Sequence, residues 1–364
     1  MSNIINFGGG ATNIPTPFKP EGKSYLTFSS PNSFTLAVGD ATKHWDGTLK
    51  YFASDKTWTI WNGTTTLSAV DDDGEYVLYL RGTGNTKFGY YDENLYDYVP
   101  WVINGTDVRC NGNIETLLDY ATVEAGQHPT MAEEDCFSCL FMGCTALTIP
   151  PALPATTLTN NCYYNMFYGC TSLTQAPALP ATTLAVNCYY QMFSRCTSLT
   201  QAPILPATTL VKRCYMNMFN GCISLTKAPA LPATTLANNC YYGMFWNCTS
   251  LTQAPALPAT TLADWCYAYM FNDCISLKLS SSKTGEYIQE YRIPTTGAGT
   301  TAVDALTNMF TDTGGTFTGT PSINTTYYLS TDNMIVRETE VATLNGYVGS
   351  MIDAAIGNAI GGSY

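Results

Sequence analysis

Cysteine is the residue type whose number and spacing in this chain could most directly do chemistry. Fourteen cysteines occur, and twelve of them form six pairs in which the second follows the first by eight residues. The spacing of four between Cys162, Met166 and Cys170 predicts one face of a short helix. A helix would hold these two cysteines roughly 12 Å apart, whereas bridged Cα atoms lie within about 7 Å. We therefore predict free thiols that fill a packed interior.

Other reactive residue types are few and scattered. Cys136 and Cys139 form a single CxxC sequence, but zinc requires two further ligands, and Cys139 falls at a variable position that we expect at the surface. The two histidines, His44 and His128, lie far apart in the sequence, which argues against a Ser-His-Asp or Cys-His site. The acidic run at residues 71–75 lacks the alternating ligands of a calcium loop and predicts a solvated hairpin turn. We predict a protein that is not an enzyme and uses no cofactor or metal.

The cysteine pairs belong to a repeat of 26 residues, which runs six times without insertion between residues 136 and 277. One copy, at residues 188–213, reads CYYQMFSRCTSLTQAPILPATTLVKR. A fixed period of this length is typical of a solenoid, in which stacked units bury one continuous core. SLTQAP predicts a short strand, and LPATTL predicts the crossing to the opposite side. We expect a leucine-rich-repeat-like solenoid at residues 136–279, with a parallel sheet on one face and short helices on the other.

The segments that flank the repeats differ from them in composition. Residues 1–22 predict an extended arm, and residues 23–105 predict a β-sandwich from short β-branched and aromatic runs separated by Gly, Asp and Asn. Residues 106–135 and 280–330 are expected to cap the solenoid, with a helix at residues 113–121. Residues 331–364 predict a helical tail, which either mediates oligomerisation or docking or packs on its own chain. Its apolar residues, three and four apart, are Val341, Leu344, Val348, Met351 and Ala355.

The copies differ from one another only at certain positions, which we expect to face solvent and to carry any binding specificity. Aromatic residues at such positions suit binding, because they bring contact area at low entropic cost; partial burial between copies is the alternative. In the predicted sandwich, alternation within TWTIW places Trp58 and Trp61 on opposite sides, one in the core and one more exposed. The candidate binding surface comprises Tyr164, Tyr190, Arg195, Lys212, Arg213, Tyr242, Trp246, Trp265, Tyr269 and Trp61.

Composition narrows the classes of function. Only 12% of residues are charged and the net charge is −12, which argues against non-specific nucleic-acid binding. No apolar run approaches the roughly 18–20 residues of a membrane span. Residues 1–20 lack the basic and apolar regions of a secretory signal, so we expect either a cleaved signal or another route out of the cell. A surface that is polar but sparsely charged is common in extracellular and virion proteins.

The repeated sequence MFxxCxSLTxAPxLPATTL resembles the BspA-type leucine-rich repeat of bacterial surface proteins over residues 136–277. The resemblance implies adhesion or binding, and it brings no catalytic residues to transfer to this chain. The order of β-domain, repeats and tail is similar to structural proteins of phages that infect gut Bacteroidetes-type hosts.

These observations give three hypotheses for function. The first is a non-enzymatic phage virion protein, a head or tail fibre, decoration or receptor-binding component on the virion surface, whose repeats adhere to a host surface glycan or protein. Its expected partners are other virion proteins or copies of itself, including a homotrimer, without nucleic acid or membrane insertion. The alternative is a bacterial cell-surface adhesin of the BspA type. An enzyme such as a glycan depolymerase would need a carboxylate pair, and the only acidic residues inside the array, residues 136–277, are Asp264 and Asp273.

Overall fold

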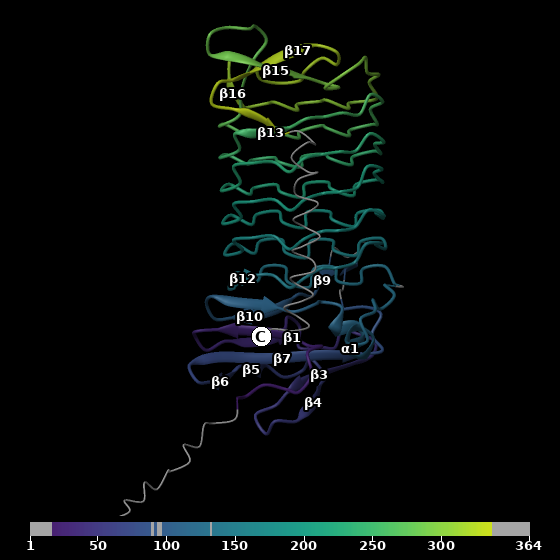
Figure 1. Ribbon diagram of the computed structural model, residues 1–364, viewed down its shortest axis with the longest axis vertical. Helices are drawn as coiled ribbons and strands as arrows, with labels where there is room; N and C mark the ends of the chain where they lie inside the picture. Colours follow the sequence, from purple (N-terminus) through teal and green to yellow (C-terminus); the bar gives the residue numbers. More distant parts are fainter. Residues whose placement is uncertain (1–16, 89–90, 93–96, 132, 337–364) are drawn as a thin grey trace, which may run out of the picture.

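The computed structural model describes residues 17–88, 91–92, 97–131 and 133–336. Figure 1 shows an elongated molecule with a β-rich part at one end, further strands at the other, and the repeats stacked between them as successive tiers. We number the tiers 1 to 6 by their first cysteines, at residues 136, 162, 188, 214, 240 and 266. Residues 1–16 of the predicted arm lie outside the described residues. So does most of the predicted helical tail, including Val341, Leu344, Val348, Met351 and Ala355.

The largest sheet joins the N-terminal part to the repeats. It contains seven strands: in order, β12 (Leu147–Ile149), β11 (Val108–Asn111), β1 (Leu26–Ser30), β7 (Glu75–Thr83), β3 (Thr48–Phe52) and β4 (Trp58–Trp61), with β6 (Val70–Asp72) also paired to β7. Neighbouring strands are antiparallel, except that β11 and β12 are parallel. The antiparallel pairing of β6 with β7 confirms the hairpin predicted at residues 71–75.

Smaller elements complete this end of the molecule. One three-stranded sheet has the order β10 (Trp101–Asn104), β2 (Thr35–Val38), β5 (Leu67–Ser68), and β8 (Tyr91–Asp92) pairs with β9 (Asp97–Tyr98). Helix α1 (Thr116–Glu124) occurs near the helix predicted at residues 113–121. It approaches β7 closely at Gly82, where an added Cβ would come within 1.5 Å of the Leu117 carbonyl oxygen. Only glycine fits at this contact.

The prediction of a separate β-sandwich is wrong. Five strands lie in the runs expected to form it, β1 to β4 and β7, but they do not form two facing sheets that stand apart from the repeats. The reason is the parallel pairing of Val108 with Leu147, which extends the larger sheet into tier 1. Tier 1 also bonds directly to the N-terminal part: the backbone N–H of Phe88 donates to Cys136 and that of Trp101 to Leu140.

The predicted repeat fold, a solenoid with a continuous parallel sheet and short helices, is also wrong. Helix α1 is the only helix among the described residues, and it precedes the repeats. Strands within the repeats are limited to β12 and β13 (Gln253–Pro255), which belong to separate sheets, together with isolated parallel bridges such as Thr157 with Thr183. The residues expected to be helical form consecutive turns in every tier.

The C-terminal end is a four-stranded sheet of order β15 (Tyr287–Arg292), β17 (Thr326–Ser330), β14 (Lys278–Ser280), β16 (Gly314–Gly315). The chain then returns along the tiers, and β18 (Met334–Val336) pairs in parallel with β13 of tier 5. Residues 303–312 lie over tier 6, where Tyr267 donates its N–H to Ala305 and Phe271 donates to Met309. These residues supply the backbone partners that tier 6 would otherwise lack.

Two columns of stacked rings form the core of the tiers. Phenylalanines from Phe141 to Phe271, one per tier, and then Phe310, have centroids 5.5–5.8 Å apart and planes within 7° of parallel. A second column, Phe137 followed by five tyrosines ending at Tyr267, has spacings of 5.7–6.0 Å. Because successive planes are so nearly parallel, the tiers stack with little twist and equivalent residues lie in straight columns.

Candidate binding surface

The turns that carry the candidate residues have a period of four residues. We number positions from the first cysteine of each tier, which is position 0. Positions −1, +3 and +7 have positive φ in all six tiers, between 50° and 73°; in tier 2 they are Asn161, Asn165 and Gly169. Asn and Gly adopt this left-handed conformation most readily, which accounts for their frequency at these positions. A left-handed residue at every fourth position is incompatible with a right-handed helix.

Backbone hydrogen bonds alternate in direction along these turns. In tier 2, the N–H of Tyr164 donates to the Asn161 carbonyl within the tier, whereas the N–H of Asn165 donates to Tyr190 in tier 3. The same alternation recurs in the other tiers. Wherever both tiers belong to the repeats, the N–H of the inter-tier bond donates to a carbonyl 25 residues later in the chain. Every second residue therefore bonds one tier to the next, and the turns are held as firmly along the stack as within a tier.

The cysteines lie on the inner side of the turns, as predicted. All fourteen are free and buried. The second cysteine of a tier donates its S–H to a phenylalanine carbonyl of the preceding tier, as Cys170 does to Phe141 at 3.0 Å. Burial raises the pKa of Cys188 and of Cys266 to about 12, so these thiols are protonated at neutral pH. Cys139, which we expected at the surface, is buried as well.

The outward positions of the turns are −2, −1, +2, +3, +6 and +7, because positions 0, +1, +4, +5 and +8 are buried in every tier. The exposure expected for the variable residues is only partly correct, since Asn165 and Asn217 at position +3 are buried. Among the candidate residues, Arg195, Lys212 and Arg213 are exposed. Six aromatic candidates are half-buried: Tyr164, Tyr190, Tyr242, Trp246, Trp265 and Tyr269.

Trp61 does not belong to a binding surface. Its side chain is 1% exposed, its indole N–H donates to the Thr65 carbonyl at 2.8 Å, and its ring packs on Trp45 and Trp101. Trp58, on the opposite side of β4, is half-buried and stacks with the Arg81 guanidinium. Strand alternation separated the two tryptophans correctly, but it could not indicate which side of the strand faces the core.

The predicted aromatic residues fall into two groups. In tiers 2 and 3, the Tyr164 and Tyr190 rings stack with centroids 4.7 Å apart, and the Arg195 guanidinium lies 5.5 Å from the centre of the Tyr168 ring. Tyr168 was not among the predicted residues, although position +6 varies among the tiers. The second group lies in tiers 5 and 6.

We call this second group, Tyr242, Trp246, Trp265 and Tyr269, the aromatic cluster. Tyr242 contacts Tyr269 and Trp265, with ring centroids 5.3 Å and 6.3 Å away. Trp246 stacks on Tyr269 at 5.6 Å and donates its indole N–H to Asp273 at 2.8 Å. Asp264, just before Trp265, accepts the N–H of Val303 at 3.1 Å. The cluster is therefore a half-buried aromatic surface held by contacts between adjacent tiers.

Two members of the cluster are held in an unfavourable backbone conformation. Trp265 and Tyr269 have φ of 58° and 56°, at positions −1 and +3. Position −1 is Asp, Asn or Arg in the other tiers, and position +3 is Asn, Gly, Gln or Cys. A left-handed conformation costs about 1–2 kcal/mol for most L-residues, and such strain is concentrated at functional sites. The sequence indicated both residues as aromatic candidates for binding. The strain can be recognised only from the backbone geometry.

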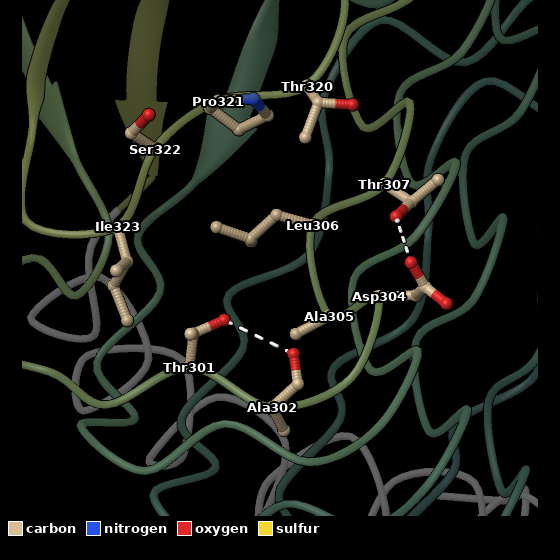
Figure 2. A pocket seen from close by; sticks show the side chains of 10 residues that line it. All are labelled: Thr301, Ala302, Asp304, Ala305, Leu306, Thr307, Thr320, Pro321, Ser322 and Ile323. Carbon is tan, nitrogen blue, oxygen red and sulfur yellow. Dashed lines mark hydrogen bonds between the residues drawn. The ribbon is translucent and has the colours of Figure 1, made fainter.

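Other potential sites have simpler explanations. His44 and His128 lie in different parts of the chain, where they contact Asp40 at 2.8 Å and Glu115 at 2.7 Å respectively. A shallow hollow of about 330 Å³ lies beside the C-terminal strands, lined by residues 301–302, 304–307 and 320–323 (Figure 2). Its single carboxylate, Asp304, accepts a hydrogen bond from Thr307 at 3.1 Å. Within the described ranges, no group of three or more His, Cys, Asp or Glu side chains could hold a metal.

No family model, no curated protein and no solved structure matches this chain. The resemblance of the repeats to the BspA type stays a prediction. Among the helices of the described residues, none has the length and apolar character needed to cross a membrane.

Proposed function

We propose that this chain is a non-enzymatic virion protein of a phage, a fibre, decoration or receptor-binding component, whose repeats adhere to a glycan or protein on the host surface. The tiers support this proposal by their division into two sets of positions. Inward positions repeat almost unchanged and maintain the stack, whereas outward positions differ from tier to tier. A rigid scaffold with variable outward residues suits recognition.

The observation that carries the proposal is the conformation of Trp265 and Tyr269. Both rings are bulky, both residues have left-handed backbone, and both contact Tyr242. Selection for stability alone favours Asn or Gly in this conformation, and at each of the two positions three of the five other tiers have Asn or Gly. Large half-exposed aromatic side chains supply most of the binding energy at many interfaces and stack on sugar rings. Their retention despite the strain favours a role in contact with a target.

The two carboxylates beside the aromatic cluster, Asp264 and Asp273, support a binding role over a catalytic one. Asp273 accepts the Trp246 indole N–H, and Asp264 accepts both the Val303 N–H and, at 3.5 Å, the side-chain amide of Asn238. Both groups thus hold neighbouring parts of the surface in place. A glycan-cleaving site would instead need two carboxyl groups directed at one bond.

A glycan array tests the adhesive function, because it presents many surface sugars to the whole chain at once. Tyr242→Met removes one ring without disturbing the turn, since Met216 occupies the same position in tier 4. Tyr190→Met is the matched control in tier 3. We expect Tyr242→Met to lose about tenfold or more of the array signal and Tyr190→Met to lose less. Equal signals for both variants and the unaltered chain would refute a role for the cluster.

The virion location needs a separate experiment. Mass spectrometry of purified phage particles, from a phage that encodes this chain, should find it in fixed proportion to the capsid protein. Its absence from particles, together with its presence on bacterial cells, would refute the virion proposal and favour the bacterial adhesin.

A further inference from the structure

The seven-stranded sheet ends in β4, whose outer edge pairs with no strand among the described residues. At the opposite end of this sheet, β12 passes into the tiers, where the Thr174 N–H donates to the Thr148 carbonyl. Figure 1 places β4 at the end of the molecule furthest from the C-terminal sheet. An unpaired strand edge is a ready template for another strand. The molecule therefore ends, on this side, in a surface that can extend its own sheet.

The pairing of β4 with β3 shows which backbone groups lie on this edge. The Ala53 N–H donates to the Thr57 carbonyl at 2.8 Å, and hydrogen-bonded pairs then recur at every second residue of the antiparallel hairpin. Thr59 therefore bonds to β3, whereas the N–H and C=O groups of Trp58 and Ile60 point away from it. Across this edge, the described residues make no backbone hydrogen bond to these four groups.

The sequence of β4 does not protect this edge. Natural edge strands are usually blunted by Lys, Pro or a bulge, but Trp58–Trp61 contains no charge, no proline and no glycine, and its pairing with β3 has no bulge. The Ile60 side chain is 66% exposed, the highest value among the large hydrophobic residues that the structure describes. Strand β6, by contrast, carries Asp71 and Asp72. An apolar edge of this kind fits a partner strand that is equally apolar.

We propose that two copies of this chain join end to end, by antiparallel pairing of their β4 strands about a twofold axis at Thr59. In this register, Trp58 of each copy pairs with Ile60 of the other, so the edge-facing groups of both copies form four inter-chain hydrogen bonds. The axis is perpendicular to the sheet, so the core faces of the two sheets lie on the same side. The result is one continuous sheet through both copies, with the two stacks of tiers pointing in opposite directions.

The side chains that meet in this register are complementary. Trp58 and Ile60 lie on the face of β4 opposite Trp61, away from the main core. The Trp58 ring contacts Phe52 at 5.4 Å and Tyr25 at 6.3 Å, at the border of a second, smaller apolar core. The second copy's Ile60 would cover the open side of Trp58 and extend this small core across the contact. The most exposed apolar side chain of each copy is thereby buried by the other.

The contact leaves the proposed binding surface free. Only the N-terminal end of each copy takes part, whereas the aromatic cluster lies in tiers 5 and 6, near the other end (Figure 1). Each dimer displays two copies of that cluster at its far ends. Because the interface consists of backbone hydrogen bonds and apolar side chains, its affinity should depend little on salt. A contact between two four-residue strands is smaller than the roughly 1,200 Å² of standard interfaces, so we expect reversible association.

A cysteine at the twofold axis tests the register. Opposite residues in a non-hydrogen-bonded antiparallel pair have Cα atoms about 4.5 Å apart, within the range of a disulfide. Thr59→Cys should therefore give a covalent dimer under mild oxidation, seen by non-reducing gel electrophoresis. Ile60→Cys is the matched control, because the two Ile60 positions are diagonal neighbours about 7–8 Å apart. The fourteen native cysteines are buried and should stay reduced.

Sedimentation velocity over a concentration series tests the dimer without a crosslink. The unaltered chain should approach twice 39.6 kDa as its concentration rises, at low and at high salt alike. Ile60→Pro removes an N–H that the second copy must bind, and it keeps the bonds to β3 because this N–H points away from β3. Since the dimer loses two hydrogen bonds, dimerisation should weaken about tenfold or more. Ile60→Val keeps the N–H and a β-branched side chain, and it should dimerise nearly as well as the unaltered chain.

Three results would each overturn the dimer: an unaltered chain that stays monomeric over the whole series, a folded Ile60→Pro that associates as tightly as the unaltered chain, or Ile60→Cys that crosslinks as readily as Thr59→Cys. Thermal unfolding checks the fold of each variant, and the cysteine test decides if Ile60→Pro does not fold. A dimer no longer than the monomer, by small-angle X-ray scattering, would refute the end-to-end arrangement. These experiments contain no glycan, host cell or virion. Their failure therefore leaves the proposed function intact, just as an inert glycan array would leave the dimer intact.

Discussion

Trp246 in tier 5 donates its indole N–H to the carboxylate of Asp273 in tier 6, across 2.8 Å. The bond joins position +6 of one tier to position +7 of the next, and it fixes the plane of a ring that also stacks on Tyr269. A carboxylate of tier 6 and the largest ring of tier 5 are therefore a single structural unit. A single substitution in this unit can therefore test how the Trp246 ring is held in place.

Replacement of Asp273 by glycine should release the Trp246 ring. Asp273 has φ of 61°, and glycine occupies the same position in tiers 1, 2 and 4, so the backbone is not strained by the change. We expect the Trp246 indole N–H resonance to move upfield and the binding of any glycan found on the array to weaken. The control is Asp312→Gly, a left-handed aspartate with φ of 55° beyond tier 6. An unchanged Trp246 resonance would contradict the hydrogen bond.

Trp265→Asn and Tyr269→Asn should differ in their effects on stability, and only Tyr269→Asn should be destabilising. Each relieves about 1–2 kcal/mol of left-handed strain. Trp265 makes one ring contact, at 6.3 Å, whereas Tyr269 makes two closer ones, each worth about 0.5–1.5 kcal/mol in addition to burial. Urea unfolding should therefore show Trp265→Asn unchanged or up to about 1 kcal/mol more stable, and Tyr269→Asn less stable. A large loss for Trp265→Asn would show that its packing outweighs the strain.

Tyr215→Phe should stabilise the protein. The Tyr215 side chain is 1% exposed, and its hydroxyl is buried without a hydrogen-bond partner. Leaving such a group unpaired costs about 1–3 kcal/mol, and Phe137 already occupies the same position in tier 1. We expect the free energy of unfolding to rise by about 1 kcal/mol. Tyr291→Phe, whose hydroxyl donates to the Pro255 carbonyl at 3.1 Å, is the control and should be destabilising.

Stability should fall steeply at alkaline pH. Burial raises the pKa of Cys188 and Cys266 to about 12 from an ordinary value of 9.0, and it raises the pKa of the other buried thiols as well. The neutral thiol is the form that the folded state keeps. The stability that the buried neutral thiols contribute is therefore complete below pH 9. It is lost as the pH rises from 9 towards 12, because the thiols of the unfolded chain lose their protons in this range while those of the folded chain keep them.

Each such thiol contributes about 1.4 kcal/mol of destabilisation per pH unit above 9, so the effect of many thiols is large. The urea midpoint should be nearly constant from neutral pH to about pH 8 and then drop sharply. Ultraviolet absorbance of thiolate should appear together with loss of the folded circular dichroism signal. Thiolate that appears earlier, in the folded protein, would contradict the burial.

The period of the repeats and the roles of its apolar residues could be read from the sequence, but the local conformation was predicted wrongly. Cys162, Met166 and Cys170 are four apart, which suits both a helix of 3.6 residues per turn and a series of four-residue turns. The distinguishing residues are Asn161, Asn165 and Gly169, also four apart. They favour left-handed conformation, which a right-handed helix cannot contain at every fourth residue.

Non-local contacts explain the other errors. The pairing of Val108 with Leu147, which merges the N-terminal sheet with tier 1, depends on residues 39 positions apart and leaves no local pattern. Likewise, alternation in β4 could not indicate that Trp61 faces the core, because the core is formed by Trp45, Phe88 and Trp101 from elsewhere in the chain. The four residues of the aromatic cluster could be named from the sequence as candidates, whereas their contacts with one another depend on the fold.

The inter-tier hydrogen bonds determine how the molecule would respond to mechanical load. They join tiers that are stacked along the long axis, so each tier boundary bears the full tension applied between the two ends of the stack, and the boundaries can fail one at a time (Figure 1). The weakest boundary would open first, and each tier that unfolded would release the same length of chain, 26 residues. A protein that attaches a particle to a cell would thereby lengthen in equal steps under force, and it would limit the peak load on the attachment.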